Sequence, residues 1–393
     1  MHLHRTHPLL PILLGSTLLH ASTLAQEPAY WVSTTASTNL ADGAPLDDGD
    51  LARLRVGEGA RLQRAAGHWM ALAGFVPGDV DALAGRPGVG AGRLDHMAFS
   101  LLSNEAGVLD GDVLGFSPTG GLIVLVAEEE LAAGLGVPGA SLDVDALAYD
   151  EAGALLFSLQ ADLDDSVLGP VADGDILRRD AAGAITRSWT EEAVQAACTA
   201  ATGSASAIGD VQGLSYAAGQ LSVLVQAPSA SDGALIRIDP QPSVLFDEAQ
   251  AELGGAELDA IATLDGSLGA DLPRLTIDPQ LASPGSSMTA SYLGGGPSEL
   301  VVVLAAGGAG WFDAPYLAGV GGFAMDPLDP WLVNASQNGV PLVVLDVLGQ
   351  ANSAFQLPVG VQGGTGLAGE MGWTFQTVEL GALVVGEPYR VQL

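Results

Sequence analysis

The sequence contains no lysine, a single cysteine and few histidines, and each shortage excludes a class of protein. All 13 basic residues are arginine and face 46 acidic residues, which gives a net charge of −33. A charge of this sign and size repels nucleic acids and anionic membranes, so we expect neither as a partner. Because Cys198 stands alone, an intrachain disulfide is excluded and a structural zinc site is implausible.

Residues suited to nucleophilic catalysis are also scarce. Beyond the first 25 residues only His68 and His96 remain, and no Gly-x-Ser-x-Gly motif occurs. No glycine-rich phosphate loop joins a strand to a helix, despite 53 glycines. We interpret His96 as a structural histidine and Cys198 as a packing residue of a short helix.

Long apolar runs are missing as well, apart from a short one near the N-terminus. Leu9 to Leu19 follows a basic start (His2, His4, Arg5 and His7) and precedes Thr23-Leu24-Ala25. This order is typical of a secretory signal, and the run is too short to span a bilayer. We expect residues 1–25 to be removed and the protein to be secreted, periplasmic or at the cell surface. An uncleaved N-terminal anchor is the alternative, and the composition favours a bacterial source.

Two short acidic signatures alternate along the chain. The first is Asp-Gly-Asp before an apolar residue: Asp48-Gly49-Asp50, Asp110-Gly111-Asp112, Asp173-Gly174-Asp175 and a weaker Asp232-Gly233-Ala234, at spacings of 62, 63 and 59 residues. The second is acid-x-Asp-Ala-Leu, in the copies Asp79-Val80-Asp81, Asp143-Val144-Asp145, Asp210-Val211-Gln212 and Glu257-Leu258-Asp259, the last two being degenerate. Regular alternation of this kind predicts a repeat protein.

The third unit shows what one repeat contains. Four apolar runs around Gly-containing turns predict strands over 145–149, 154–159, 175–179 and 184–189. Thr190 then resembles an N-cap before a short helix over 191–200. The same helix signal recurs at 128–135 and 247–253.

Four strands in each repeat are typical of the blades of a β-propeller. The chain enters at Tyr30-Trp31-Val32-Ser33, which matches the second strand of a unit, and the missing first strand is found at 257–262. We therefore expect a closed ring of four all-β units, with an open stack of β-hairpins as the alternative.

The pattern resembles, at the level of architecture, the hemopexin-like four-bladed propeller, in which a blade opens with an Asp-Ala strand and ends with a short helix. Asp81-Ala82, Asp145-Ala146 and Asp259-Ala260 carry this resemblance, whereas Gln212-Gly213, the long units and the missing disulfide depart from it. The chain is also similar to repeat-bearing secreted bacterial proteins. Neither likeness implies a particular ligand.

The repeats stop at Asp271-Leu272-Pro273, which we interpret as a boundary between domains 26–271 and 272–393. Strand patterns follow over 274–277, 287–292, 299–304, 341–348, 354–359, 373–378 and 383–393. About seven strands in a segment of this size predict a C-terminal β-sandwich.

The repeated aspartates are the candidate metal ligands, and calcium is the expected ion because it prefers carboxylate and carbonyl oxygens. One set lies in the Asp-Gly-Asp turns: Asp48, Asp50, Asp110, Asp112, Asp173 and Asp175. The alternative for this set is turn chemistry, with the glycine at positive φ. The other set, Asp81, Asp145 and Asp259, would face the channel of a closed ring. Its alternative is to cap strand starts at a solvated rim.

These patterns favour an exported, acidic, non-catalytic binding or scaffold protein, stabilised by calcium, with an extracellular protein or carbohydrate as partner. A secreted hydrolase that attacks polysaccharide through paired carboxylates is the alternative. Its sugar-stacking face would be an aromatic group near Asp326 and Asp329, namely Trp311, Phe312, Tyr316, Phe323 and Trp331. The same aromatics would otherwise pack the sandwich core. A third possibility is a structural surface component whose acidity only keeps it soluble.

Overall fold

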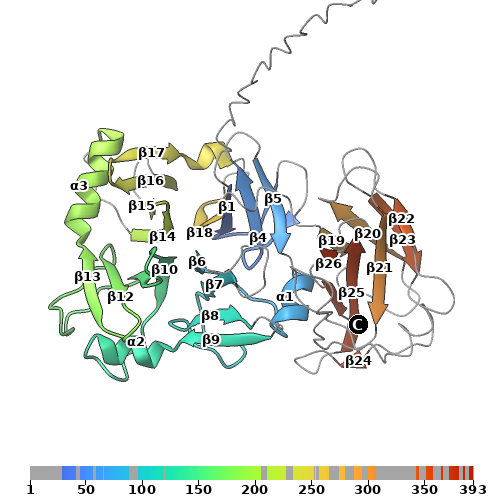
Figure 1. The fold of residues 1–393 in the computed structure, drawn as a ribbon, viewed down its shortest axis with the longest axis horizontal. Coiled ribbons are helices and arrows are strands. Elements are labelled where there is room, and N and C mark those ends of the chain that lie inside the picture. The colour runs from blue at the N-terminus through green and yellow to red at the C-terminus, as the bar shows by residue number, and fades with distance from the viewer. Residues whose placement is uncertain are drawn as a thin grey trace, which may run out of the picture.

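A computed structural model shows how the predicted units are arranged (Figure 1). It describes residues 29–40, 45–55, 59–64, 66–87, 96–117, 121–204, 210–226, 233–251, 253 and 256–264. Beyond these it describes the backbone of strands between 274 and 392. None of the helices in these described segments is both long and apolar enough to cross a membrane.

Residues 29–264 form four four-stranded antiparallel sheets, arranged as the blades of a propeller. Blade I contains β18 (Leu258–Leu264), β1 (Ala29–Thr34), β4 (Leu51–Arg55) and β5 (Gly59–Arg64), in spatial order. Blade II contains β6 (Ala82–Gly85), β7 (Met97–Ser100), β8 (Val113–Phe116) and β9 (Leu122–Val126). Blade III contains β10 (Val144–Tyr149), β11 (Leu155–Leu159), β12 (Ile176–Arg179) and β13 (Ile185–Trp189). Blade IV contains β14 (Asp210–Ala217), β15 (Gln220–Gln226), β16 (Ala234–Asp239) and β17 (Ser243–Phe246).

The ring closes as the sequence predicts. Strand β18 pairs antiparallel with β1, so that Trp31 lies opposite Ala262 and Val32 lies opposite Ile261. The four inner strands also touch in a circle, because β6 contacts β10 and β18 while β14 contacts the same two strands. Figure 1 shows β6, β10, β14 and β18 around the centre. The open stack of hairpins is therefore wrong.

A short helical segment follows each blade. The helices are α1 (Ala66–Leu72), α2 (Glu128–Gly134), α3 (Glu191–Thr202) and the 3₁₀ turn η2 (Glu248–Ala251). The Thr190 side chain accepts a hydrogen bond from the Ala193 N–H, which confirms the predicted cap of α3. Helix α1 is not predicted from the sequence, because its first turn lacks an acidic residue. The segment predicted as a helix at 247–253 is a shorter 3₁₀ turn.

The hydrophobic core lies between neighbouring blades rather than in one central mass. Each of four buried clusters joins side chains of two adjacent blades. Strand β10 shows why, because Leu147 packs in the cluster between blades II and III while Ala146 and Ala148 pack between blades III and IV. Successive residues of a strand point to opposite faces, so both faces of each blade are buried. This accounts for the nearly continuous apolar strands.

The C-terminal region consists of strands in two further antiparallel sheets. One sheet has the order β19 (Arg274–Asp278), β20 (Ser287–Leu293) and β23 (Ala351–Gln356). The other contains β22 (Leu342–Val344), β21 (Leu300–Ala306), β25 (Met371–Glu379) and β24 (Gly364–Thr365), with β26 (Val384–Val385) and β27 (Tyr389–Gln392) also paired to β25. The strand predicted over 383–393 is thus two short strands on one partner.

Candidate functional site

Three aspartates from different blades are brought to the inner strands, at the same end of each strand. Asp81 directly precedes β6, Asp145 is the second residue of β10, and Asp259 is the second residue of β18. Their side chains are 1%, 3% and 6% exposed, so they do not lie on a solvated rim. The fourth blade places Gln212 at the equivalent point. We call Asp81, Asp145 and Asp259 the inner aspartates.

A second set of acids surrounds the inner aspartates. Asp79, Asp143 and Asp210 lie two residues before Asp81, Asp145 and Gln212. Asp79 hydrogen-bonds to Asp259. Asp145 hydrogen-bonds to both Asp81 and Asp210. These bonds form two groups, one of Asp79 with Asp259 and one of Asp145 with Asp81 and Asp210. The charge of Asp81 acts on Asp259, and that of Asp143 acts on Asp81, so the two groups and Asp143 interact electrostatically. We call all six carboxyls the axial cluster (Asp79, Asp81, Asp143, Asp145, Asp210 and Asp259).

Burial makes the inner aspartates hold their protons. Removal from water raises the pKa of Asp81 to about 8, of Asp145 to about 11 and of Asp259 to about 9. The charged neighbours that add most to these shifts are other carboxylates, led by Asp143, Asp210 and Asp81 respectively. An uncompensated buried carboxylate is costly, so a carboxyl that stays here must be neutral or must find a cation.

The outer acids of the cluster titrate closer to neutrality. Burial raises the pKa of Asp79 and Asp210 to about 6 and that of Asp143 to about 7. The hydrogen bonds from Asp259 and Asp145 oppose this rise at Asp79 and Asp210. In the Asp259–Asp79 and Asp145–Asp210 pairs, the inner carboxyl therefore keeps the proton. It donates a hydrogen bond to the outer carboxylate.

Apart from the bonds among the carboxyls themselves, some oxygens of the cluster are not satisfied by the protein. Oδ2 of Asp81 and Oδ2 of Asp145 are inaccessible and accept no hydrogen bond from an N–H or hydroxyl group of the described residues. Such oxygens have the chemistry of calcium ligands. Even so, within that part of the chain no group of three or more Asp, Glu, His or Cys side chains already stands around a point that would hold a metal ion. A cation would require the carboxyls to give up their mutual hydrogen bonds.

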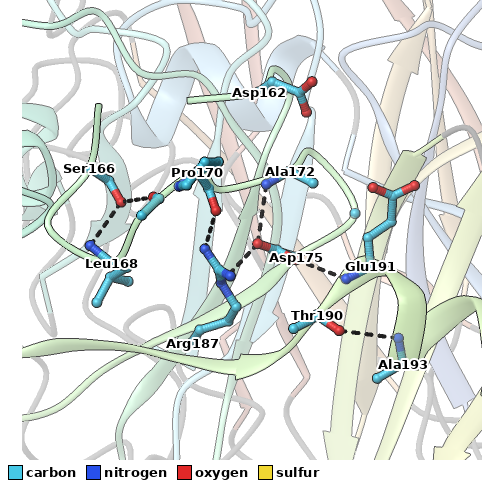
Figure 2. Close-up of polar contacts among 12 residues, drawn as sticks. Asp162, Ser166, Leu168, Pro170, Ala172, Asp175, Arg187, Thr190, Glu191 and Ala193 are labelled. Carbon is cyan, nitrogen blue, oxygen red and sulfur yellow. Dashed lines mark hydrogen bonds and ion pairs between the residues drawn. The ribbon is translucent and has the colours of Figure 1, made fainter. Parts of the chain in front are cut away.

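The Asp-Gly-Asp segments form turns whose second aspartate is buried and fully engaged, as Figure 2 shows for the third copy. Asp175 accepts hydrogen bonds from the N–H of Ala172 at 3.1 Å and from that of Glu191 at 2.8 Å. It also forms an ion pair with Arg187, whose Nε lies 2.9 Å away. One carboxylate thus fastens its own turn, the start of α3 and the outer strand β13.

The other copies repeat this arrangement in part. Asp112 accepts from the N–H of Leu109 at 3.0 Å and from that of Glu128, the first residue of α2, at 2.8 Å. Asp50 accepts from the Asp47 N–H at 3.2 Å. The first aspartates of the turns, Asp48, Asp110 and Asp173, each accept from the N–H of the following glycine. These hydrogen bonds explain the Asp-Gly-Asp motif as a turn stabilised by its own aspartates. Calcium binding at these six aspartates stays a prediction.

The glycine of the motif has a different purpose from the one that the sequence suggested. Positive φ is found only at Gly233 of the weak fourth copy. At Gly49 and Gly111 a Cβ atom would lie 2.1 Å from the carbonyl oxygens of Pro77 and Leu142. Both carbonyls belong to the segments that lead into the next inner strand. At these two positions glycine is needed because the turn of one blade touches the backbone that positions the next blade's aspartates, whereas a Cβ at Gly174 would meet the Glu191 side chain.

The isolated histidines and the cysteine are structural, as expected. His68 is fully buried in α1, and His96 packs edge-on against Trp31 with ring centroids 5.8 Å apart. Cys198 is buried in α3, where desolvation raises its pKa to about 11 and so keeps it a thiol. The aromatic group at 311–331 lies outside the described residues.

Comparison with known proteins adds little to this description. No protein-family model and no curated protein matches the chain. Among solved structures, the chain is similar to the extracellular domain of the putative hybrid two-component system BT4673 from B. thetaiotaomicron, at 10% identity and a TM-score of 0.22. The match covers 92% of this chain and 45% of that one. At this score the likeness carries no argument about function.

Proposed function

We propose that this chain is an exported, non-catalytic binding or scaffold protein in which calcium neutralises the axial cluster and so holds the blades together. The observation that supports this most is that Asp81 and Asp145 each have a buried carboxyl oxygen that no N–H or hydroxyl group of the described residues satisfies. Those residues come from blades II and III, and Asp259 adds a ligand from the closing strand of blade I. A divalent ion among them would replace the shared protons as the source of neutrality.

Thermal unfolding with EDTA, compared with excess Ca²⁺, tests this function. We expect Ca²⁺ to raise the melting temperature, and to raise it more at pH 8 than at pH 5, because protons compete for the same oxygens. Asp145→Asn should remove most of the calcium effect. Asp164→Asn, which changes an exposed loop aspartate, is the matched control and should retain it. An unchanged melting temperature in the native protein at both pH values would refute calcium stabilisation.

Export and domain organisation belong to the same proposal. We infer that residues 1–25 are cleaved, that the repeat domain spans 26–271, and that 272–393 form a β-sandwich able to contact an extracellular protein or a carbohydrate. The proposal rests on the signal-like N-terminus and on the strand-rich C-terminal segment. Mass spectrometry of protein recovered from the medium or periplasm of an expressing bacterium should give a chain that begins at Gln26.

A hydrolase remains a second candidate because the cluster contains acid–base pairs. In the Asp79–Asp259 pair, the pKa of Asp79 is raised to about 6 and that of Asp259 to about 9, so one carboxyl is ionised and the other protonated near neutrality. Burial of Asp259 keeps a polymer away from this pair, which favours the non-catalytic function. Release of reducing sugar from a polysaccharide panel, abolished by Asp79→Asn, would reverse that preference.

A further inference from the structure

Strand β9 is the outermost strand of blade II and has an open edge. It occupies the end of the sheet order β6-β7-β8-β9, and the strand that pairs with it among the described residues is β8. Leu122, Ile123 and Val124 lie opposite Phe116, Gly115 and Leu114. Figure 1 shows β9 at the periphery of the propeller, below β8. Within the described part of the chain, the opposite edge of β9 is available for another strand.

The side chains of β9 are unusual for such an edge. The strand reads Leu-Ile-Val-Leu-Val and contains no polar residue. Ile123 is 38% exposed and Val124 is 48% exposed. Neighbouring residues of a strand point to opposite faces, so apolar surface is presented on both sides of the same edge. Edge strands of monomeric proteins normally carry charge, proline or a bulge that discourages pairing.

The outer strands of the other blades follow that rule more closely. β13 contains Thr186, Arg187 and Ser188, whereas the arginine of β5 whose side chain is described, Arg64, is buried over Trp69. β17 has one exposed valine, Val244, beside Ser243 in a strand of four residues. Among the described outer strands, β9 is the one with two strongly exposed apolar residues, Ile123 and Val124.

Acidic residues directly follow β9 and restrict the choice of partner. Glu128, Glu129 and Glu130 form the first turn of α2. Glu128 is buried and accepts from the Leu142 N–H, and Glu130 pairs with Arg179, so Glu129 is the exposed carboxylate of this turn for which no contact is shown. A segment paired with β9 would place one of its ends beside Glu129, where a basic residue is favoured. A second copy of the chain fits poorly, because each copy carries a net charge of −33 and no lysine.

We propose that β9 is a docking edge for an extended segment of another protein, which adds a fifth strand to blade II. The segment is apolar at alternate positions and carries arginine or lysine at the end that lies beside Glu129. Main-chain hydrogen bonds supply affinity, while Ile123 and Val124 select apolar side chains. This inference names a partner class for the binding function proposed above, and it uses a surface separate from the axial cluster.

A labelled synthetic peptide, Arg-Thr-Val-Thr-Val-Thr-Val-Gly, is the probe, and fluorescence anisotropy with the full chain is the measurement. We expect saturable binding below about 1 mM, lost when two threonines are replaced by proline and weakened when arginine is replaced by aspartate. Hydrogen exchange of the amides at 122–126 should slow in the complex. Asp164→Asn should leave peptide binding unchanged. Peptide binding is compared in EDTA and in Ca²⁺ well below the melting temperature of each sample, so failure of the calcium proposal, read from the melting temperature, and failure of this one, read from the peptide, are distinguishable.

Variants of the edge decide between a true docking site and non-specific contact. Val124→Lys should weaken peptide binding about tenfold or more. Val244→Lys, at the comparably exposed valine of β17, should leave it within about twofold. Val124→Thr, which keeps the β-branched shape, serves if the lysine variant does not fold. Equal losses from Val124→Lys and Val244→Lys, absence of saturable binding, or a dimer that Val124→Lys dissociates would each overturn the proposal.

Discussion

Ser158 donates a hydrogen bond from its Oγ to the carbonyl oxygen of Val211 at 3.0 Å, across the junction between blades III and IV. Ser100 makes the equivalent bond to the carbonyl oxygen of Val144 at 2.7 Å, between blades II and III. Both serines are completely buried, and each acceptor precedes the inner-strand position of the next blade. A serine on the second strand therefore fixes the depth at which the following inner strand is held.

Replacing Ser158 with alanine should lower the free energy of unfolding by about 1 to 2 kcal/mol, because the buried Val211 carbonyl loses its partner. Ser188→Ala, at an exposed position of β13, is the control and should change the free energy by less than about 0.5 kcal/mol. Urea denaturation followed by circular dichroism measures both. Equal stability of the two variants would show that the bond contributes nothing.

The axial cluster predicts an unusual dependence of stability on pH in the absence of metal. Folding raises the pKa of Asp81 from 3.8 to about 8, so above pH 4 the folded chain binds more protons than the unfolded chain. The free energy of unfolding should therefore be highest near pH 4 and fall as pH rises toward 8, by at most about 1.4 kcal/mol per pH unit for each such proton.

Asp145→Asn is the informative variant for this pH dependence. It keeps a neutral polar side chain in place of the carboxyl whose pKa is raised most, to about 11. In EDTA at pH 8 the variant should be more stable than the native protein, and the slope of stability against pH should decrease. Denaturant titrations between pH 4 and pH 9 measure this, and a slope identical to the native one would contradict it.

The glycine of the Asp-Gly-Asp turn should be indispensable where it touches backbone. Gly111→Ala places a Cβ against the Leu142 carbonyl, and this carbonyl cannot move without shifting the segment that enters β10. The substitution should lower the free energy of unfolding by about 2 kcal/mol or more. Gly139→Ala is the comparison, because that glycine has a φ of +83° and open space around it. It should cost only about 1 kcal/mol of backbone strain. The reverse order in thermal melts would contradict close contact as the cause.

Closure of the ring predicts a specific cross-link. Val32 and Ile261 lie opposite each other in β1 and β18, and both pack in the cluster between blades IV and I. The double variant Val32→Cys with Ile261→Cys should form a disulfide on mild oxidation and gain thermal stability, since the bond spans most of the repeat domain. The single variants are controls for pairing with Cys198. Failure to cross-link in the folded protein would count against the β1–β18 pairing.

The sequence was sufficient to predict the ring because its strands are marked by repeated turns at constant spacing. Tyr30 to Ser33 matches the second strand of a repeat unit and lies in β1. The closing strand predicted over 257–262 begins and ends within two residues of β18. α1 was missed because its entry lacks the capping and acidic residues that mark α3. Short 3₁₀ turns such as η2 do not differ from helices in composition alone.

The candidate site was predicted only in part, for a geometric reason. The repeat places Asp81, Asp145 and Asp259 at equivalent points of the inner strands, but the sequence cannot show that Asp79 and Asp210 hydrogen-bond to Asp259 and Asp145. The signal was present in the alternation of Asp-x-Asp, whose two carboxyls lie on one side of an extended chain. The positive φ predicted for the turn glycines is wrong at Gly49 and Gly111. Glycine is required there because the backbone of the next blade, distant in sequence, lies too close for a Cβ atom.

The pairing of β1 with β18 also sets an order in time. Because synthesis starts at the N-terminus, β1 is made long before residue 258. Blade I therefore lacks its inner strand while blades II to IV are being synthesised. Its completion is the contact of highest sequence separation in the ring, and such contacts form late. A chain that ends before residue 264 would lack part of β18. It would leave the edge of β1 open and the acids of the axial cluster partly hydrated. Cooperative unfolding of the whole ring, rather than of single blades, should follow from the same late step.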